Sequence, residues 1–381
     1  MKHTLITHPH SDQVQITSSL GNYYIDDKGN KILDMESGIW CASLGHNHPE
    51  ILEVIKDQYK SLSHIGKRLL PESIDEVSKK LLEISKMNGK CMFLNTGSEA
   101  IELSIMLASE SLSSPKIIGL KNNYVTAFGK GSSYDITIDI DPYLKNANNN
   151  SDYKAIRDQI EEGSIFIFDP FCFSRQILIP PKEVIETIVR EVQKKNGIVI
   201  IDEITTGMGR CGKWFGFHYF DIEPDLVVLG KSLGNGYPVS AILTNKLMAA
   251  KIELADFMHY QSHQNDPLGY FIAAKVVDII EKQDLLSEIA EKASYLRELF
   301  KQHIDPLKIV KEVRSIGLMT GVQIDNSVDV VKIFNNMLLK NIFVGASSGT
   351  NTINLFPPYT ITKEEINNCC KTLKECLESY G

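Results

Sequence analysis

Short runs of consecutive apolar residues, separated by longer helix-like stretches, constrain the fold of this 381-residue chain more than any other feature. Strands with one exposed face alternate apolar and polar residues, whereas strands covered by helices on both faces are apolar throughout. Such runs, alternating with helical patterns, are typical of a mostly parallel α/β sheet. The predicted strands are 91–94, 117–120, 164–168, 198–201 and 226–229, and the helices predicted around them include 98–112 and 181–195.

The two ends of the chain have a different pattern. Residues 14–34 are predicted to form a β-meander, and residues 270–302 one long helix. Near the C-terminus, Thr362 and Glu365 have the spacing of a capping box before an amphipathic helix. On that helix Cys369, Cys370 and Cys376 follow the apolar face, so we expect them to be core thiols.

These patterns together predict two domains. We expect a large central domain over residues 56–267, and a smaller α+β domain built from residues 1–55 together with residues 268–381. Both chain ends would then contribute to one small domain.

Composition excludes some classes of function. Forty Lys and Arg against 48 Asp and Glu give a net charge of −8, which disfavours a general nucleic-acid binder. No apolar run approaches the roughly 18 residues of a membrane span, and the first ten residues lack the apolar core of a signal peptide. Seven cysteines, an odd number without metal spacing, favour reduced thiols in the cytoplasm. No metal is predicted, and His46 and His48 are expected to be turn and packing residues.

An acid and a lysine follow two of the predicted strands. Asp202 comes directly after the strand 198–201, and Lys231 follows the next strand, 226–229. In α/β sheets, ligands bind outside the carboxyl ends of the strands. An acid and a lysine at the same edge suggest an amine nucleophile that faces an anchored cofactor.

Two other motifs fail on their context. Residues 207–212 fit the dinucleotide pattern G-x-G-x-x-G, but five residues separate them from the preceding strand and an aromatic segment follows instead of a helix. Residues 230–232 resemble the end of a P-loop, but Asp225 stands where its first glycine is required.

A phosphate site is predicted after the first of these strands. Residues 95–100, Asn-Thr-Gly-Ser-Glu-Ala, open an amphipathic helix whose free N–H groups, with Gly97 and Ser98, can hold an anion. The alternative is plain helix capping, with Thr96 and Glu99 forming a capping box.

Together these segments resemble the class III aminotransferases, the ornithine, acetylornithine and GABA type, which are pyridoxal-phosphate (PLP) enzymes of fold type I. The similarity covers residues from about 20 to about 365 in order, nearly the whole chain. The resemblance implies a large domain with a mostly parallel, seven-stranded type of sheet, and a smaller α+β domain. The motifs that carry it are 95–100, 202–210 and 230–238, with further matches at 44–50, 266–269 and 314–321.

The resemblance also implies roles for the acid and the lysine. Lys231 would hold PLP as a Schiff base and, once released, move a proton between substrate and cofactor. Asp202 would pair with the pyridine nitrogen and keep it protonated.

Other residues match the family's cofactor contacts. Gly97 and Ser98 would hold the phosphate, and Tyr124 falls where an aromatic ring stacks on the cofactor, although a core or surface tyrosine is the alternative. Thr205 stands where a glutamine often contacts the phenolic oxygen. Ser262 falls where a hydroxyl reaches the phosphate from the neighbouring subunit, which implies a homodimer with shared active sites.

The chain departs from the family where substrates are recognised. Asn354 stands where members acting on α-amino acids carry an arginine, and an amide cannot replace the bidentate charge of that arginine. Arg175 or Arg68 is a candidate for a relocated carboxylate clamp, with a solvated surface arginine as the alternative. Ile39 and Trp40 fall in the segment that lines the substrate entrance in relatives.

The sequence thus predicts a PLP-dependent aminotransferase that moves an amino group between an amine or amino acid and a keto or aldehyde acceptor. A racemase, an epimerase or an aminomutase would use the same lysine and cofactor. A catalytically silent dimer of the same fold is a third alternative.

Overall fold

The computed structural model describes residues 14–66, 68–69, 71–144, 153–172 and 177–380. Its centre is a seven-stranded sheet with the order β4-β10-β9-β8-β7-β5-β6, in which β10 is antiparallel to both neighbours and the other pairs are parallel. The mostly parallel sheet predicted from the sequence is confirmed. Its strands are β4 (Cys91–Leu94), β5 (Ile117–Leu120), β6 (Ile136–Ile138), β7 (Ile165–Phe168), β8 (Ile198–Asp202), β9 (Leu226–Leu229) and β10 (Ser240–Thr244).

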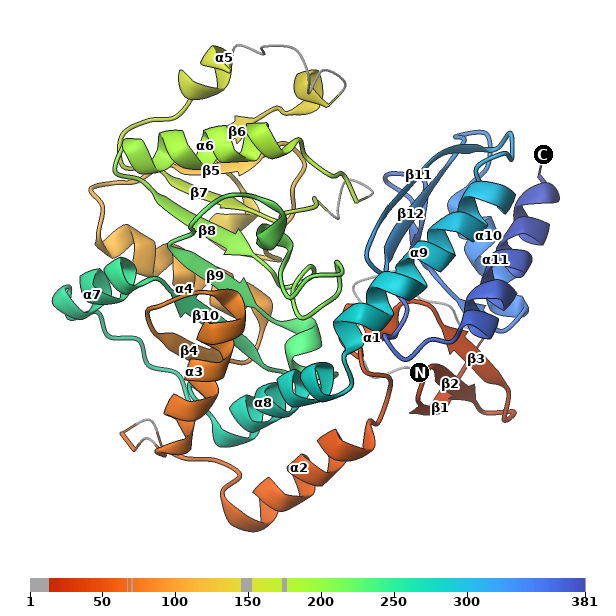
Figure 1. Cartoon of the computed structure of the whole chain (residues 1–381), viewed down its shortest axis with the longest axis horizontal. Helices are drawn as coiled ribbons and strands as arrows, with labels where there is room; N and C mark the ends of the chain where they lie inside the picture. The colour runs from red at the N-terminus through yellow and green to blue at the C-terminus, as the bar shows by residue number, and fades with distance from the viewer. Residues whose placement is uncertain (1–13, 67, 70, 145–152, 173–176, 381) are drawn as a thin grey trace, which may run out of the picture.

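Helices cover both faces of this sheet, which is why its strands are apolar on consecutive positions (Figure 1). In β7, Ile165 and Ile167 pack on one side with α4 (Gly97–Glu110), and Phe166 and Phe168 on the other with α6 (Lys182–Lys194). Other helices of this part are α2 (Pro49–Ser61), α3 (Ser73–Ser85), α5 (Lys154–Arg157), α7 (Lys246–Leu254) and α8 (Pro267–Lys282).

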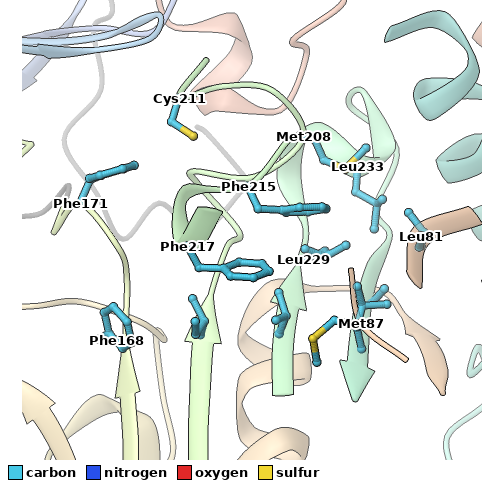
Figure 2. Close-up of a cluster of buried hydrophobic side chains, with 14 of the residues drawn as sticks. Leu81, Met87, Phe168, Phe171, Met208, Cys211, Phe215, Phe217, Leu229 and Leu233 are labelled. Atoms are coloured by element: carbon cyan, nitrogen blue, oxygen red, sulfur yellow. The ribbon is translucent and has the colours of Figure 1, made fainter. Parts of the chain in front are cut away.

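One core cluster extends beyond the sheet toward the strand ends. Phe215 and Phe217 pack above β8 and β9 together with Met208 and Leu233, while Phe171 and Cys211 lie near the loops above them (Figure 2). This apolar layer fixes the loops that follow β8 and β9, and so fixes the edge of the sheet where the chemistry is expected.

The two chain ends together form the smaller part, at the right of Figure 1. The parallel pairing of β13 with β3 joins the C-terminal half to the N-terminal meander. This part contains two four-stranded sheets. In sheet order, the strands of the first are β1 (Ile16–Leu20), β2 (Tyr23–Asp26), β3 (Lys31–Asp34) and β13 (Ile342–Phe343). Those of the second are β11 (Val310–Ile316), β12 (Met319–Ile324), β15 (Thr352–Leu355) and β14 (Gly345–Ser347).

One helix prediction from the sequence is wrong. The single helix expected over 270–302 is two helices, α8 and α9 (Leu285–His303), because Asp284 between them is left-handed with φ of 48°. The capping box of Thr362 and Glu365 is confirmed at the start of α11 (Lys363–Glu378), and α10 is Val330–Leu339. The three cysteines predicted as core thiols are buried. The boundaries of the predicted domains, at 55/56 and 267/268, stay a prediction.

None of the helices in the described ranges combines the length and apolarity that crossing a membrane requires.

Candidate active site

The acid and the lysine face one cavity at the edge of the central sheet. Asp202 is the last residue of β8, and Lys231 lies two residues beyond the end of the neighbouring parallel strand β9. The cavity has a volume of about 190 Å³. It is lined by Thr96, Gly97, Ser98, Tyr124, Val125, Asp202, Ile204, Thr205 and Lys231. The structure therefore brings together the predicted phosphate residues, Tyr124, Thr205 and the acid–lysine pair.

A larger cavity, of about 640 Å³, lies between Leu178 and Ile179 on one side and α9 and β11 on the other. None of its lining residues belongs to the predicted site. The smaller cavity is the better candidate because the reactive side chains converge there.

Lys231 is held at the floor of the site by specific contacts. Its Nζ donates a hydrogen bond to Thr205 Oγ1 at 2.6 Å and lies 4.3 Å from the ring centroid of Trp40. Enclosure lowers the pKa of Lys231, against the opposing attraction of Asp202. A lysine with a lowered pKa is more often a neutral amine, which is the nucleophilic form. The backbone of Lys231 is left-handed, with φ of 43°, a strained conformation that functional sites retain.

Asp202 is buried, and its Oδ1 accepts a hydrogen bond from the backbone N–H of Ile204 at 2.9 Å. Burial raises the pKa of Asp202, Asp169 raises it further, and Lys231 opposes the shift. A cation placed in the cavity would favour the charged form of this carboxyl. The site therefore suits a positively charged ring nitrogen facing Asp202.

The start of α4 supplies the anion cradle. The capping box predicted as an alternative is present: Glu99 N–H donates to Thr96 Oγ1 at 3.2 Å, and the Glu99 carboxylate accepts from the Thr96 N–H at 3.4 Å. Capping and anion binding are compatible, because the N–H groups of Gly97 and Ser98 still lack an acceptor within the helix. Both residues line the cavity.

The lack of a side chain at Gly97 leaves space at the cradle, and a substitution can test this. A Cβ at this position would lie 2.6 Å from Cδ1 of Ile204, another lining residue. We expect Gly97→Val to push Ile204 into the cavity and to weaken PLP binding about tenfold, equivalent to about 1.4 kcal/mol. Fluorescence titration of the apoprotein with PLP measures this. Gly349→Val, at a position with no atom within 4 Å of the added Cβ, is the control, and equal affinity in both variants would contradict the assignment.

The remaining predicted residues lie at different distances from the cavity. Trp40 contacts Lys231, whereas Ile39 is 62% exposed. Asn354 is buried in β15, and its Nδ2 donates to Ser347 Oγ at 2.9 Å. Ser262 is exposed and does not line the cavity of its own chain.

The two arginines proposed as a carboxylate clamp have different outcomes. Arg68 is exposed and absent from its lining, and Arg175 lies outside the described residues.

Arg210 is a structural element of the site to which its motif assigned no role. It is fully buried, and its guanidinium donates to Pro357 O at 2.6 Å and to Ser43 Oγ at 2.9 Å. Since Ser43 Oγ also lies 2.6 Å from Ser232 Oγ, next to Lys231, Arg210 ties three distant segments together beneath the site. A buried arginine without an acidic neighbour in sequence gives no signal of such a role.

A second polar cluster lies at the start of α8. His64 Nδ1 is 2.9 Å from Asp266 Oδ1, and His263 Nδ1 is 2.6 Å from Asp266 Oδ2. The three side chains have the chemistry of metal ligands, and sequence spacing did not predict the cluster because His64 is distant in sequence from His263 and Asp266. Each carboxylate oxygen has an imidazole partner, so the cluster is satisfied by hydrogen bonds alone.

Comparison with known proteins shows which family this chain resembles along its length. A family model described as Aminotransferase class-III matches residues 6–128 and 155–377. The acetylornithine aminotransferase of Lactococcus lactis is 30% identical over 363 residues, covering 93% of this chain and 94% of the relative. The acetylornithine aminotransferase of Streptococcus mutans is 29% identical over 372 residues, covering 95% of each chain.

Solved structures share the fold. An acetylornithine aminotransferase from Elizabethkingia anophelis superposes with a TM-score of 0.82 at 22% identity, over 98% of this chain and 96% of that one. An S-selective transaminase from Arthrobacter superposes with a TM-score of 0.88 at 18% identity, over 100% of this chain and 96% of that one. The fold type I architecture predicted from the sequence is thereby confirmed.

Proposed function

The chain belongs to the class III aminotransferases, and on this premise we propose that Lys231 and Asp202 carry out its reaction. Its relatives are aminotransferases along nearly their whole length, so the protein is a PLP-dependent enzyme that moves an amino group from an amine or amino acid to a keto or aldehyde acceptor. No observation favours the racemase, epimerase or aminomutase alternative, or a silent dimer.

The cavity fits PLP in its donors and its shape. The N–H groups of Gly97 and Ser98 suit a phosphate, Asp202 suits a protonated ring nitrogen, and the Lys231 amine suits an aldehyde. Gly97 leaves the room that a Cβ would take from Ile204. When bound, PLP supplies an electron sink for the negative charge that develops on a substrate carbon as its proton leaves.

The proposed work of the protein is binding, orientation and proton transfer. Lys231 would hold the cofactor through a Schiff base, and its released Nζ would take the proton from the substrate carbon and return it elsewhere. Its lowered pKa supports this role, because a neutral amine is the form that accepts a proton. Thr205 positions Nζ through their hydrogen bond, and Tyr124, which lines the cavity, would stack on the cofactor ring.

The donor class follows from the relatives and from Asn354, which stands where some members of the family carry an arginine. Acetylornithine aminotransferases act, by their name, on an ornithine derivative, which carries a terminal amine. Asn354 offers no charge for an α-carboxylate. We therefore propose that terminal primary amines are donors and that 2-oxo acids or aldehydes are acceptors. A panel of such donors and acceptors, with both products quantified, tests this. Inversion of a single amino acid without any acceptor, and no exchange between pairs, would contradict it.

The active site is proposed to be shared in a homodimer. Ser262 is exposed and does not line the cavity of its own chain, which supports a role in the cavity of the neighbouring subunit. A mixture of Lys231→Ala and Ser262→Ala chains tests this sharply. If Ser262 acts across the interface, half of the mixed dimers' sites have both wild-type residues, and wild-type PLP affinity and activity reappear at limiting PLP. If it acts within its own chain, mixing restores nothing.

The proposed compartment is the cytoplasm. No disulfide joins the seven cysteines in the described residues, and five of them are buried. Reduced thiols are typical of proteins that remain in a reducing compartment.

A further inference from the structure

A strained turn lies next to Lys231, because its last residue, Trp40, contacts the Lys231 amine. In α1 (Ser37–Trp40) all four residues are left-handed, with φ of 48°, 58°, 56° and 66°. A left-handed β-branched residue such as Ile39 is an outlier that persists only when its surroundings enforce it. Here the Asp34 carboxylate accepts the N–H groups of Glu36 at 2.8 Å and Gly38 at 2.7 Å. The strain therefore points to a functional reason for the position of this turn.

The turn buries the carboxyl of Glu36 against the small-part sheet. Gly345 in β14 is the cross-strand partner of Asn354 in β15. A Cβ at Gly345 would overlap with Glu36 Oε1 and would lie 3.1 Å from the Cβ of Asn354. The Glu36 carboxyl thus fills the space left by the missing side chain, on the face of the sheet that carries Asn354.

Trp40, in the same turn, contacts both Glu36 and the reactive lysine. The Trp40 side chain is a close neighbour of the Glu36 carboxyl and opposes the rise of its pKa. The Trp40 ring also lies 4.3 Å from Lys231 Nζ and 4.9 Å, between centroids, from the ring of Phe356. One indole therefore separates the carboxyl of Glu36 from the amine that would attack the cofactor.

Glu36 has no basic partner within the described ranges, since none of the ion pairs there includes it. The nearby carboxylate of Asp34 is already engaged by two N–H groups and by His46 Nε2 at 2.8 Å. Arg210 donates from its terminal nitrogens Nη1 and Nη2 to Pro357 O and Ser43 Oγ. Burial, followed by repulsion from Asp34, raises the pKa of Glu36 to about 7. A buried carboxyl in this state gains from any cation that reaches it.

We propose that Glu36, with Asn354 and Trp40 beside it, is a cation subsite that binds the second amino group of a diamine donor. This rests on the proposed function, because the first amino group must react at Lys231. A terminal ammonium would pair with Glu36, whereas the carboxylate of an amino acid would be repelled by it. The donor class is thereby narrowed from terminal amines to diamines.

Three donors of equal length test the subsite by changing only the far end. These are 1,4-diaminobutane, butylamine and 4-aminobutanoate, whose far ends are positive, neutral and negative. We expect the kcat/KM of the holoenzyme to be about 10- to 100-fold higher for the diamine than for butylamine, and lowest for the amino acid. In Glu36→Gln, the diamine-to-butylamine ratio should fall to about one, with butylamine turnover nearly unchanged. Glu110→Gln, an exposed acid at the end of α4, should keep the wild-type ratio.

A binding measurement separates recognition from turnover. Calorimetry on the PLP-loaded Lys231→Ala variant should give a diamine affinity about 10-fold or more above that of the same variant carrying Glu36→Gln. An unchanged diamine-to-butylamine ratio in Glu36→Gln, or a preference of the wild type for 4-aminobutanoate, would overturn the subsite. Turnover of any amine would still uphold the proposed function. No product from any amine would instead overturn the proposed function.

Discussion

Replacing Lys231 by alanine is expected to lower kcat by at least about 10³-fold with any donor. The variant loses the amine that holds the cofactor and the group that moves the proton, while Asp202 and the cradle at the start of α4 remain. PLP should therefore still bind, more weakly and exchangeably. Small added amines should restore part of the activity, because they can accept the proton in place of Nζ.

Borohydride reduction checks the covalent part of this prediction. Reduction of the wild-type holoenzyme should add the mass of the reduced cofactor to the peptide that contains Lys231, and reduction of Lys231→Ala should add it to no peptide. Lys246→Ala, at the exposed start of α7, should behave as the wild type. Labelling of any other lysine in the wild type would contradict the assignment.

Replacing Asp202 by asparagine is expected to lower kcat by about 10²- to 10⁴-fold, with most of the bound PLP retained. Asparagine keeps the size of the side chain but loses the charge that would hold the ring nitrogen protonated. Among the residues that line the cavity, Asp202 is the one acid, so none of the other lining residues can supply that charge.

Asp225 offers a matched control for this substitution. It is a half-buried aspartate that precedes β9, at the opposite end of the strand, where it accepts a hydrogen bond from Val199 N–H at 2.9 Å. Asp225→Asn should therefore affect thermal stability more than kcat. Equal losses of kcat in the two variants would show that Asp202 acts through the fold and not through the cofactor.

The sequence predicted the central sheet well because burial on both faces leaves a local signature. The five predicted strands are all present, with small changes at their ends. β6, with three residues, and β10 were not predicted, since neither has a long apolar run. The break before α9 was missed because it occurs at Asp284, without the glycine or proline that usually marks the end of a helix.

Some residues of the candidate site could be predicted from the sequence, and others could not. Asp202 and Lys231 could be found from sequence because each lies at or just beyond the end of a strand, and strand ends meet at one edge of a parallel sheet. Glu36 could not, because its position depends on the left-handed turn, on Asp34 and on the absent side chain of Gly345. The role of Arg210 was missed for the same reason: its partners Ser43 and Pro357 are distant in sequence.

A single-turnover reaction tests the central claim most directly. The holoenzyme is mixed with a reactive amine donor and no acceptor, and the visible absorption of the cofactor is followed together with the carbonyl product. Our account predicts a change in the cofactor spectrum, one carbonyl product per Lys231 site, and a return to the starting spectrum when a 2-oxo acid is added. A protein that stays colourless with added PLP, or a spectrum that changes without release of a carbonyl product, would contradict it.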